Sequence, residues 1–203
     1  MKIWEKMGHP LGGKASEKMT VQSFKATENN INLCKFMDGF DKKTDNAYIF
    51  GPVGAGKTHA ATALASKNSG LVMKLYQIGR FVRWGMMQNG LDEGNIIGLF
   101  SGEKISTNEF FGVAADMLVI DDLGSEKLTE FTEQILFEII DMRISKGLNG
   151  LIITSNISLP GMAKRLKCER ITSRIAGLCN GNIFSLEGED DHRFIKQPEN
   201  KNG

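Results

Sequence analysis

The feature that most constrains this chain is a glycine-rich loop, Gly51-Pro52-Val53-Gly54-Ala55-Gly56-Lys57-Thr58. The loop matches the pattern G-x-x-x-x-G-K-[ST] at every fixed position. An apolar run over residues 47–50 precedes it, and an alanine-rich stretch over residues 60–67 follows it. A strand, such a loop and a helix in this order are typical of proteins that bind the phosphates of a nucleotide through backbone amides and a helix N-terminus.

The residues of this loop have the chemistry that phosphate binding needs. Glycine allows the tight turn that directs consecutive backbone N–H groups at a phosphate. Lys57 should reach the β- and γ-phosphates, and the Thr58 hydroxyl should bind Mg²⁺. We expect every residue from Gly51 to Thr58 to contact the nucleotide. We add His59, which follows directly, as a contact residue without a catalytic role.

Further apolar runs alternate with helical patterns along the chain. Strands are predicted over residues 71–76, 117–120, 151–154 and 182–186. Helices are predicted from Thr27, as the N-cap, to Phe40, over 60–67, 78–87, 159–166 and 169–178, and along the stripe from Phe131 to Met142. This alternation predicts an α/β domain of three layers, with a mostly parallel five-stranded sheet covered by helices on both faces.

Two carboxylates follow one of the apolar strands. Asp121 and Asp122 come directly after Met117-Leu118-Val119-Ile120. Ligands bind at the carboxyl ends of parallel strands, and carboxylates buried there are costly without a cation. We therefore expect Asp121 to hold Mg²⁺ through water and Asp122 to polarise the attacking water.

The order of the strands along the chain suggests where the next polar residues lie. The whole strand over residues 71–76 separates the phosphate loop from the acidic strand, and Thr154-Ser155-Asn156 ends the strand that follows. If that strand lies between the acidic strand and the loop strand, Asn156 would point at the γ-phosphate and orient the attacking water. The alternatives are a GTPase, which the absence of an N-K-x-D motif disfavours, and a small-molecule kinase, which would transfer the phosphate to an acceptor instead of only hydrolysing ATP.

Charge and cysteine content exclude several classes of protein. The chain has 25 Lys and Arg against 24 Asp and Glu, which excludes a strongly basic nucleic-acid coat protein. The three cysteines form no CxxC pair, which disfavours a zinc ribbon or a thioredoxin-like site. The first ten residues do not resemble a signal peptide, and no apolar run is long enough for a membrane helix. A cytoplasmic protein is expected.

A basic segment follows the polar strand end. Residues 163–175 contain Lys164, Arg165, Lys167, Arg170 and Arg174 against Glu169, so this segment is locally basic in a nearly neutral chain. Arg170 and Arg174 are four residues apart, and a helix would place them on one face. Phosphoryl transfer commonly uses an arginine to stabilise charge in the transition state. The first three cations are better explained as a solvated face or a weak contact with nucleic acid.

Taken together, these stretches resemble the AAA+ ATPases of the DnaC/DnaI helicase-loader and IstB transposition-helper family. The similar segments are FKATENNINLCKF, YIFGPVGAGKTH, MLVIDDLGSE, GLIITSN, ERITSRIAGLCN and FSLEGEDDHR, which span residues 24–194. The resemblance implies an ASCE-type AAA+ domain without a C-terminal helical lid, and an ATP- and Mg²⁺-dependent ATPase. It implies that Arg174, with Arg170 as a nearby candidate, enters the site of a neighbouring subunit. It also implies that Arg193 contacts the nucleotide.

The expected organisation is a flexible basic arm over residues 1–22, an AAA+ domain over 23–195 and a disordered tail over 196–203. The resemblance implies a loader that self-associates through Arg174 and binds single-stranded DNA and a DnaB-type replicative helicase. Loaders of this family have a separate N-terminal domain that binds the helicase, whereas only about 22 residues precede the similar region here. An IstB-like ATPase that helps transposition, with duplex DNA and a transposase as partners, is the alternative. A nucleotide-regulated adaptor with little turnover also remains open.

Overall fold

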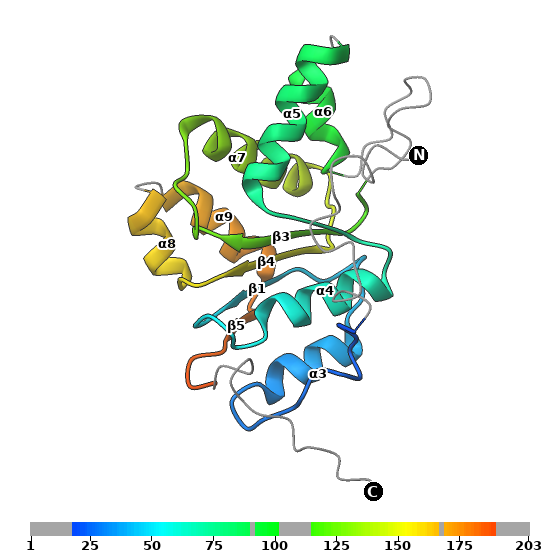
Figure 1. Ribbon diagram of the computed structural model, residues 1–203, viewed down its shortest axis with the longest axis vertical. Coiled ribbons are helices and arrows are strands. Elements are labelled where there is room, and N and C mark those ends of the chain that lie inside the picture. The colour runs from blue at the N-terminus through cyan, green and yellow to red at the C-terminus, as the bar shows by residue number, and fades with distance from the viewer. Residues whose placement is uncertain (1–17, 90–91, 102–114, 167–168, 190–203) are drawn as a thin grey trace, which may run out of the picture.

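The computed structural model describes residues 18–89, 92–101, 115–166 and 169–189. A five-stranded sheet forms its centre, in the order β2-β3-β4-β1-β5 (Figure 1). The strands are β1 (Ala47–Phe50), β2 (Leu71–Met73), β3 (Leu118–Leu123), β4 (Leu151–Ser155) and β5 (Ile183–Ser185). All four pairings are parallel. The predicted five-stranded parallel sheet is confirmed. β4 lies between β3 and β1, which is the strand order that the predicted position of Asn156 requires.

Helices cover both faces of the sheet and complete the three layers (Figure 1). One face carries α3 (Ile31–Gly39) and α4 (Lys57–Lys67). The other carries α5 (Leu75–Asn89), α6 (Glu93–Leu99), α7 (Glu130–Ser145) and α9 (Glu169–Cys179), while α8 (Leu159–Leu166) follows the end of β4. Residues 186–189, the last that the structure describes, contain no helix, in keeping with the expected AAA+ domain without a lid.

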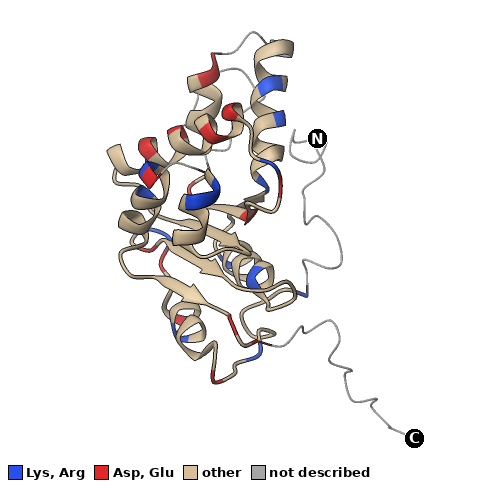
Figure 2. Ribbon diagram, turned by 90° about the vertical axis from the view of Figure 1, so that its left-hand side faces the viewer, with Lys and Arg blue, Asp and Glu red and all other residues tan. Residues whose placement is uncertain are grey.

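The inner strands β1, β3 and β4 are apolar up to their carboxyl ends because both of their faces are buried. In β3, Leu118 and Ile120 point into the core under α5–α9, whereas Val119 points into the core under α3 and α4. Successive side chains of a strand point to opposite faces, so a sheet covered on both sides needs an uninterrupted apolar run. Figure 2 shows the result, since charged residues lie mainly on helices and loops.

Helix α5 begins earlier than the sequence predicted. The strand expected over residues 71–76 ends at Met73, and Leu75 starts α5. The Gln77 side chain accepts a hydrogen bond from the Lys74 N–H at 2.8 Å, and Glu126 accepts one from the Tyr76 N–H at 3.1 Å. These acceptors satisfy N–H groups at a helix start. Because Glu126 is distant in sequence, local propensity did not reveal this start.

The prediction of Thr27 as a helix N-cap was wrong. Helix α3 begins at Ile31, after Asn30. The Thr27 hydroxyl instead accepts from the Asn30 N–H and donates to Glu189, next to the C-terminal end of the described chain. The tertiary contact with Glu189 therefore fixes Thr27 before the helix begins.

Helix α6 was not predicted within the weakly periodic region 88–112. Asp92 caps it by accepting from the Asn95 N–H at 3.3 Å, and Ile96, Ile97 and Leu99 are buried. This cap and the apolar residues after it are a signal that the sequence contained. Helix α8, by contrast, has the predicted bounds.

The two expected terminal segments lie mostly outside the described residues. Residues 1–17 of the arm and all of 196–203 belong to the parts that the structure does not describe. Residues 18–22 form turns, and Thr20 contacts the domain through His59. Within the described ranges, no helix is both long and apolar enough to span a bilayer.

Candidate nucleotide-binding site

The glycine-rich loop connects β1 to α4 at the carboxyl edge of the sheet. Gly56 precedes the first turn of α4 with φ of 92°, a left-handed conformation that residues with a Cβ rarely adopt. A Cβ on Gly51 would lie 3.0 Å from the backbone of Leu186, so glycine allows the loop to approach β5 closely. Ala55 is buried, whereas Pro52 and Val53 are exposed. The loop therefore has the geometry that a phosphate cradle at a helix N-terminus needs.

Lys57 is folded back onto this loop. Its ammonium donates to the carbonyls of Gly51 at 2.8 Å and Pro52 at 2.6 Å, and the residue is buried. An ammonium group has three donors, and it is costly to bury without acceptors. The carbonyls thus hold a cation at the loop, where anionic phosphate oxygens could replace them.

Thr58 and Asp121 meet directly, although they come from different elements. The Thr58 hydroxyl donates to Asp121 Oδ1 at 2.9 Å, and the Thr154 hydroxyl of β4 donates to the same oxygen at 2.7 Å. Asp121 is 7% exposed. A hydroxyl and a carboxylate are the hard oxygen ligands that Mg²⁺ prefers beside phosphates. These residues fit a nucleotide-bound Mg²⁺.

A bulge in β3 contains the two aspartates. The pairing with β4 shifts between Ile120 and Leu123, and Asp122 has φ of 60°. The Asp122 N–H donates to the Thr154 hydroxyl at 2.8 Å, which stabilises this conformation. Bulges re-aim side chains and are common next to functional sites. The sequence predicted the two aspartates but not the bulge that orients them.

Asp122 is held on both sides by other strand ends. Asn156, after β4, donates to Asp122 Oδ1 at 3.1 Å, so the structure brings this predicted pair together. Lys74, after β2, contacts Asp122 Oδ2 at 3.1 Å. Burial lowers the pKa of Lys74, but the hydrogen bond and the charge of Asp122 outweigh it, and the net pKa is raised. The Lys74 ammonium therefore stays protonated at neutral pH and remains paired with the Asp122 carboxylate.

Lys74 was not among the site residues predicted from the sequence. The residue looked like an interior position of a longer strand, although it directly follows the buried Val72 and Met73. A cation at the carboxyl end of a parallel strand was the available signal, because such ends are where ligands bind. This signal points to Asp122 as the partner only when it is known that β2 pairs with β3, because Lys74 and Asp122 are far apart in sequence.

The loop after β4 is held in place by a hydrogen bond from a buried tyrosine. The Tyr48 hydroxyl donates to the Ile157 carbonyl at 2.6 Å, and the Ser155 hydroxyl donates to the Leu123 carbonyl at 2.7 Å. Burial raises the pKa of Tyr48 to about 12, so the phenol remains a donor at neutral pH. Asn156 lies between two anchored neighbours and is itself exposed toward solvent.

His59 contacts protein rather than standing free beside the loop. Its Nε2 lies 3.0 Å from the Ser23 hydroxyl and 3.1 Å from the Thr20 carbonyl. The ring also meets Phe24 edge-on, with centroids 5.4 Å apart. These contacts attach the segment before α3 to the first turn of α4, next to the phosphate loop.

The two candidate arginines lie on the opposite helix layer. Arg174 is on α9, which packs with α7, whereas the phosphate loop leads into α4 on the other face of the sheet (Figure 1). The Arg174 guanidinium forms an ion pair with Asp141 of α7, with Nη2 2.8 Å from Oδ1. Arg170 is exposed. The structure therefore does not bring either arginine to its own phosphate loop. Arg193 lies outside the described residues.

Solved structures with the same fold include DnaC, DnaI and DnaA. The DnaC helicase loader has 21% identity and a TM-score of 0.62, covering 85% of this chain and 99% of that one. DnaI has 17% identity and a TM-score of 0.64, covering 87% and 94%. AMPPCP-bound DnaA from Aquifex aeolicus has 20% identity and a TM-score of 0.62, covering 87% of this chain but 52% of that one. A comparison with curated proteins found no match.

The family is shown by sequence as well as by fold. A model of the family described as IstB-like ATP binding protein matches residues 23–177, which is most of the chain. This match and the DnaC and DnaI structures confirm the resemblance that the motifs indicated, including an α/β domain of the AAA+ type. The chain therefore belongs to the family of IstB-like ATP binding proteins.

Proposed function

We propose that this protein hydrolyses ATP and loads a DnaB-type replicative helicase onto single-stranded DNA. The observation that carries the proposal is the side-chain cluster at the carboxyl edge of the sheet. There the loop residue Thr58 meets Asp121, and Asp122 meets Asn156. A phosphate loop beside one carboxylate for a metal and a second for water is the arrangement that ATP hydrolysis requires.

In the proposed reaction, loop amides and Lys57 bind the β- and γ-phosphates, after Lys57 leaves the carbonyls of Gly51 and Pro52. Mg²⁺, held by Thr58 and Asp121, would supply further positive charge at the phosphates. Asp122 accepts a proton from water, which attacks the γ-phosphorus while the bond to ADP breaks. Asn156 orients that water, and Arg193 contacts the nucleotide.

We propose that Arg174 acts on the nucleotide of a neighbouring copy. Support comes from its position on the helix layer opposite α4, where it pairs with Asp141 of its own chain. A cation supplied from another subunit stabilises negative charge in the transition state. Turnover should therefore depend on assembly, and a ring or spiral on DNA is the expected active form.

A transposition helper is the second candidate. The family model that matches is named for IstB-like proteins, which favours this reading. The loader is favoured because the fold covers 99% of the DnaC helicase loader structure. The two differ in the DNA that they bind, single-stranded for a loader and duplex for a transposition helper.

The test is ATP turnover at several protein concentrations, with no DNA, with a single-stranded oligonucleotide and with the matching duplex. For a loader, turnover per chain should rise with protein concentration and with single-stranded DNA, and Arg174→Ala should abolish the rise. Affinity for DNA should fall steeply with salt. Stimulation by the duplex alone would favour the transposition helper, and concentration-independent turnover unaffected by Arg174→Ala would exclude both.

A further inference from the structure

Arg170 and Arg174 both meet one aromatic ring on the neighbouring helix. Phe137 lies half-buried on α7 and faces α9. The guanidinium carbon of Arg170 lies 4.7 Å from the ring centroid, and that of Arg174 lies 4.8 Å from it. The negative face of an aromatic ring attracts cations at such distances. A single side chain thus restrains two arginines that repel each other.

Asp141 adds a second restraint to Arg174. It lies four residues after Phe137, one turn further along the same side of α7. Its Oδ1 accepts from Nε of Arg174 at 3.0 Å and lies 2.8 Å from Nη2. Among the residues that the structure describes, Arg170 has no carboxylate within ion-pair distance. Arg174 is therefore the more firmly held of the two.

These contacts leave one edge of the Arg174 guanidinium unused. A guanidinium has five N–H donors in a rigid plane. Asp141 engages the edge formed by Nε and Nη2, and Phe137 lies against the plane. Within the described chain, no acceptor contacts Nη1. The edge formed by Nη1 and Nη2 is the one that binds two phosphate oxygens at once.

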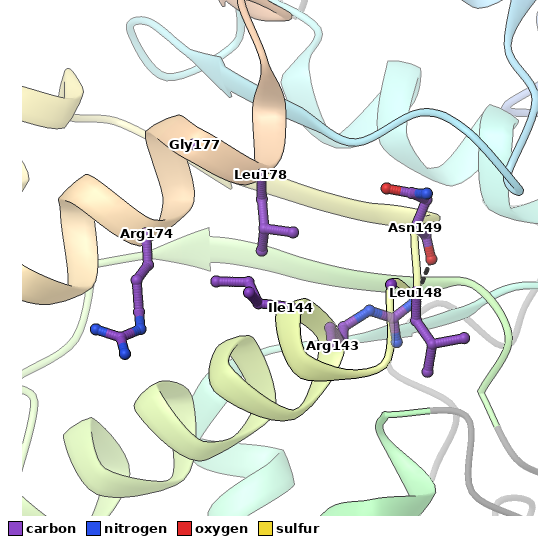
Figure 3. A pocket seen from close by; sticks show the side chains of 8 residues that line it. Arg143, Ile144, Leu148, Asn149, Arg174, Gly177 and Leu178 are labelled. Atoms are coloured by element: carbon purple, nitrogen blue, oxygen red, sulfur yellow. Dashed lines mark hydrogen bonds between the residues drawn. The ribbon is translucent and has the colours of Figure 1, made fainter.

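The surroundings keep Arg174 accessible. Its side chain is 29% exposed and points from α9 toward α7 (Figure 3). It forms part of the wall of a hollow of about 290 Å³, which Ile144 and Leu178 also line. The side chain is thus restrained on one side and open on another.

We propose that Phe137 and Asp141 are positioning residues for Arg174. They hold its guanidinium in advance, with the outer edge free to contact the phosphate of a neighbouring copy. This inference rests on the proposed function of Arg174. A restrained cation loses less side-chain freedom when it meets the transition state, and an arginine has much to lose. The ring and the carboxylate should therefore affect turnover without touching the nucleotide.

A subunit-mixing experiment isolates this effect. The acceptor is the full chain with Arg174→Ala, which keeps its nucleotide site. The donor is the full chain with Lys57→Ala, which keeps its arginines. Each is measured alone and mixed, with ATP, Mg²⁺ and a single-stranded oligonucleotide. The mixture should recover turnover that neither chain has alone, because only the donor supplies Arg174 to the acceptor's site.

Three further donors test the positioning residues in the Lys57→Ala background. Phe137→Leu keeps an apolar side chain but removes the ring, and Phe137→Tyr keeps the ring. Asp141→Asn removes the charge at a side chain that is 47% exposed, where loss of folding is not expected. Donors with Phe137→Leu or Asp141→Asn should rescue about tenfold less turnover than the parent donor, whereas Phe137→Tyr should rescue it fully. The KM for ATP should not change, since the acceptor's site is untouched.

The outcomes separate the two proposals. If the Lys57→Ala donor rescues nothing, Arg174 does not act in trans, and both proposals fail. If it rescues and the Phe137→Leu and Asp141→Asn donors rescue equally well, only the positioning role is overturned. A loss with Phe137→Tyr equal to that with Phe137→Leu would overturn the role of the ring. Thermal unfolding of each donor identifies a folding defect, and Asp141→Asn decides the outcome if Phe137→Leu has one.

Discussion

The nucleotide site and the α7–α9 surface both contain charged side chains, but they restrain them differently. In the nucleotide site, strand ends from across the sheet meet, and Asp121 and Asp122 are each held by two other side chains. On the α7–α9 surface, one ring and one carboxylate restrain two arginines that remain partly accessible. In the nucleotide site, both aspartates have hydrogen-bond partners within one chain. On the α7–α9 surface, Arg174 keeps N–H donors free of acceptors among the described residues. This difference fits the proposal that one chain binds the nucleotide and receives Arg174 from a second copy.

The largest effect should come from the nucleotide site. Lys57→Ala removes the cation that neutralises the β- and γ-phosphates, so affinity for a non-hydrolysable ATP analogue should fall about a hundredfold and turnover should be lost. Calorimetric titration measures the affinity. Lys67→Ala, at the exposed far end of the same helix, is the matched control and should behave as the parent. Equal affinities for both variants would show that the loop does not bind the phosphates.

The second effect tests the α7–α9 surface. Arg174→Ala should lower DNA-stimulated turnover about a hundredfold, because the transition state loses its cation. Arg170→Ala should lower it less than about tenfold, since Arg174 keeps both Phe137 and Asp141. Neither variant should weaken nucleotide binding, which a fluorescent ATP analogue can measure. A larger loss with Arg170→Ala would identify Arg170 as the residue that acts in trans.

The third effect concerns Asp122. Lys74→Met removes the ion pair and should lower kcat about tenfold with an unchanged KM, because the Asp122 carboxylate loses a group that orients it. The control is Lys42→Met, which breaks a looser pair with Asp116, 4.0 Å apart. An unchanged kcat in Lys74→Met would mean that Asn156 alone orients Asp122.

The ion pair between Lys74 and Asp122 also makes the free energy of unfolding depend on pH. The pKa of Lys74 is raised above its ordinary 10.5. The stability that this shift contributes is fully present below pH 10.5 and is lost as the pH rises through the raised value. Urea unfolding of the parent and of Lys74→Met should therefore differ by a constant amount from pH 6 to about pH 9. A difference that changes within this range would contradict the ion pair.

The smallest effect should come from the Tyr48 hydrogen bond that holds the loop after β4. Tyr48→Phe removes the hydrogen bond to Ile157, so the free energy of unfolding should fall by about 1 kcal/mol at pH 7, with turnover changed less than about twofold. Burial raises the pKa of Tyr48 from 10 to about 12. The parent should therefore lose stability relative to Tyr48→Phe as the pH rises from 10 toward 12. An equal difference between the two proteins at pH 7 and pH 11 would rule out this buried phenol as the cause.

Local signals made much of the fold predictable. The strand β1 has the predicted bounds because it is a short apolar run between turn residues, and the helix α8 also has the predicted bounds. The predicted boundaries were wrong where contacts with residues distant in sequence set the start of a helix. Glu126 accepts from the first turn of α5 and shortens the strand before it, and Glu189 binds Thr27 before α3 begins. Helix α6 differs, because its N-cap Asp92 is a local signal that the sequence contained but the prediction did not use.

The phosphate loop, the two aspartates and the parallel sheet follow from the amino-acid sequence. These features depend on residues that are neighbours in the chain, and their chemistry follows from type and spacing. The contact of Lys74 with Asp122, the bulge that orients the aspartates and the restraint of Arg174 by Phe137 and Asp141 arise from the packing of the folded domain. Each of these contacts joins elements that are separate in sequence. They exist because strand order and helix packing, not local propensity, set which side chains meet.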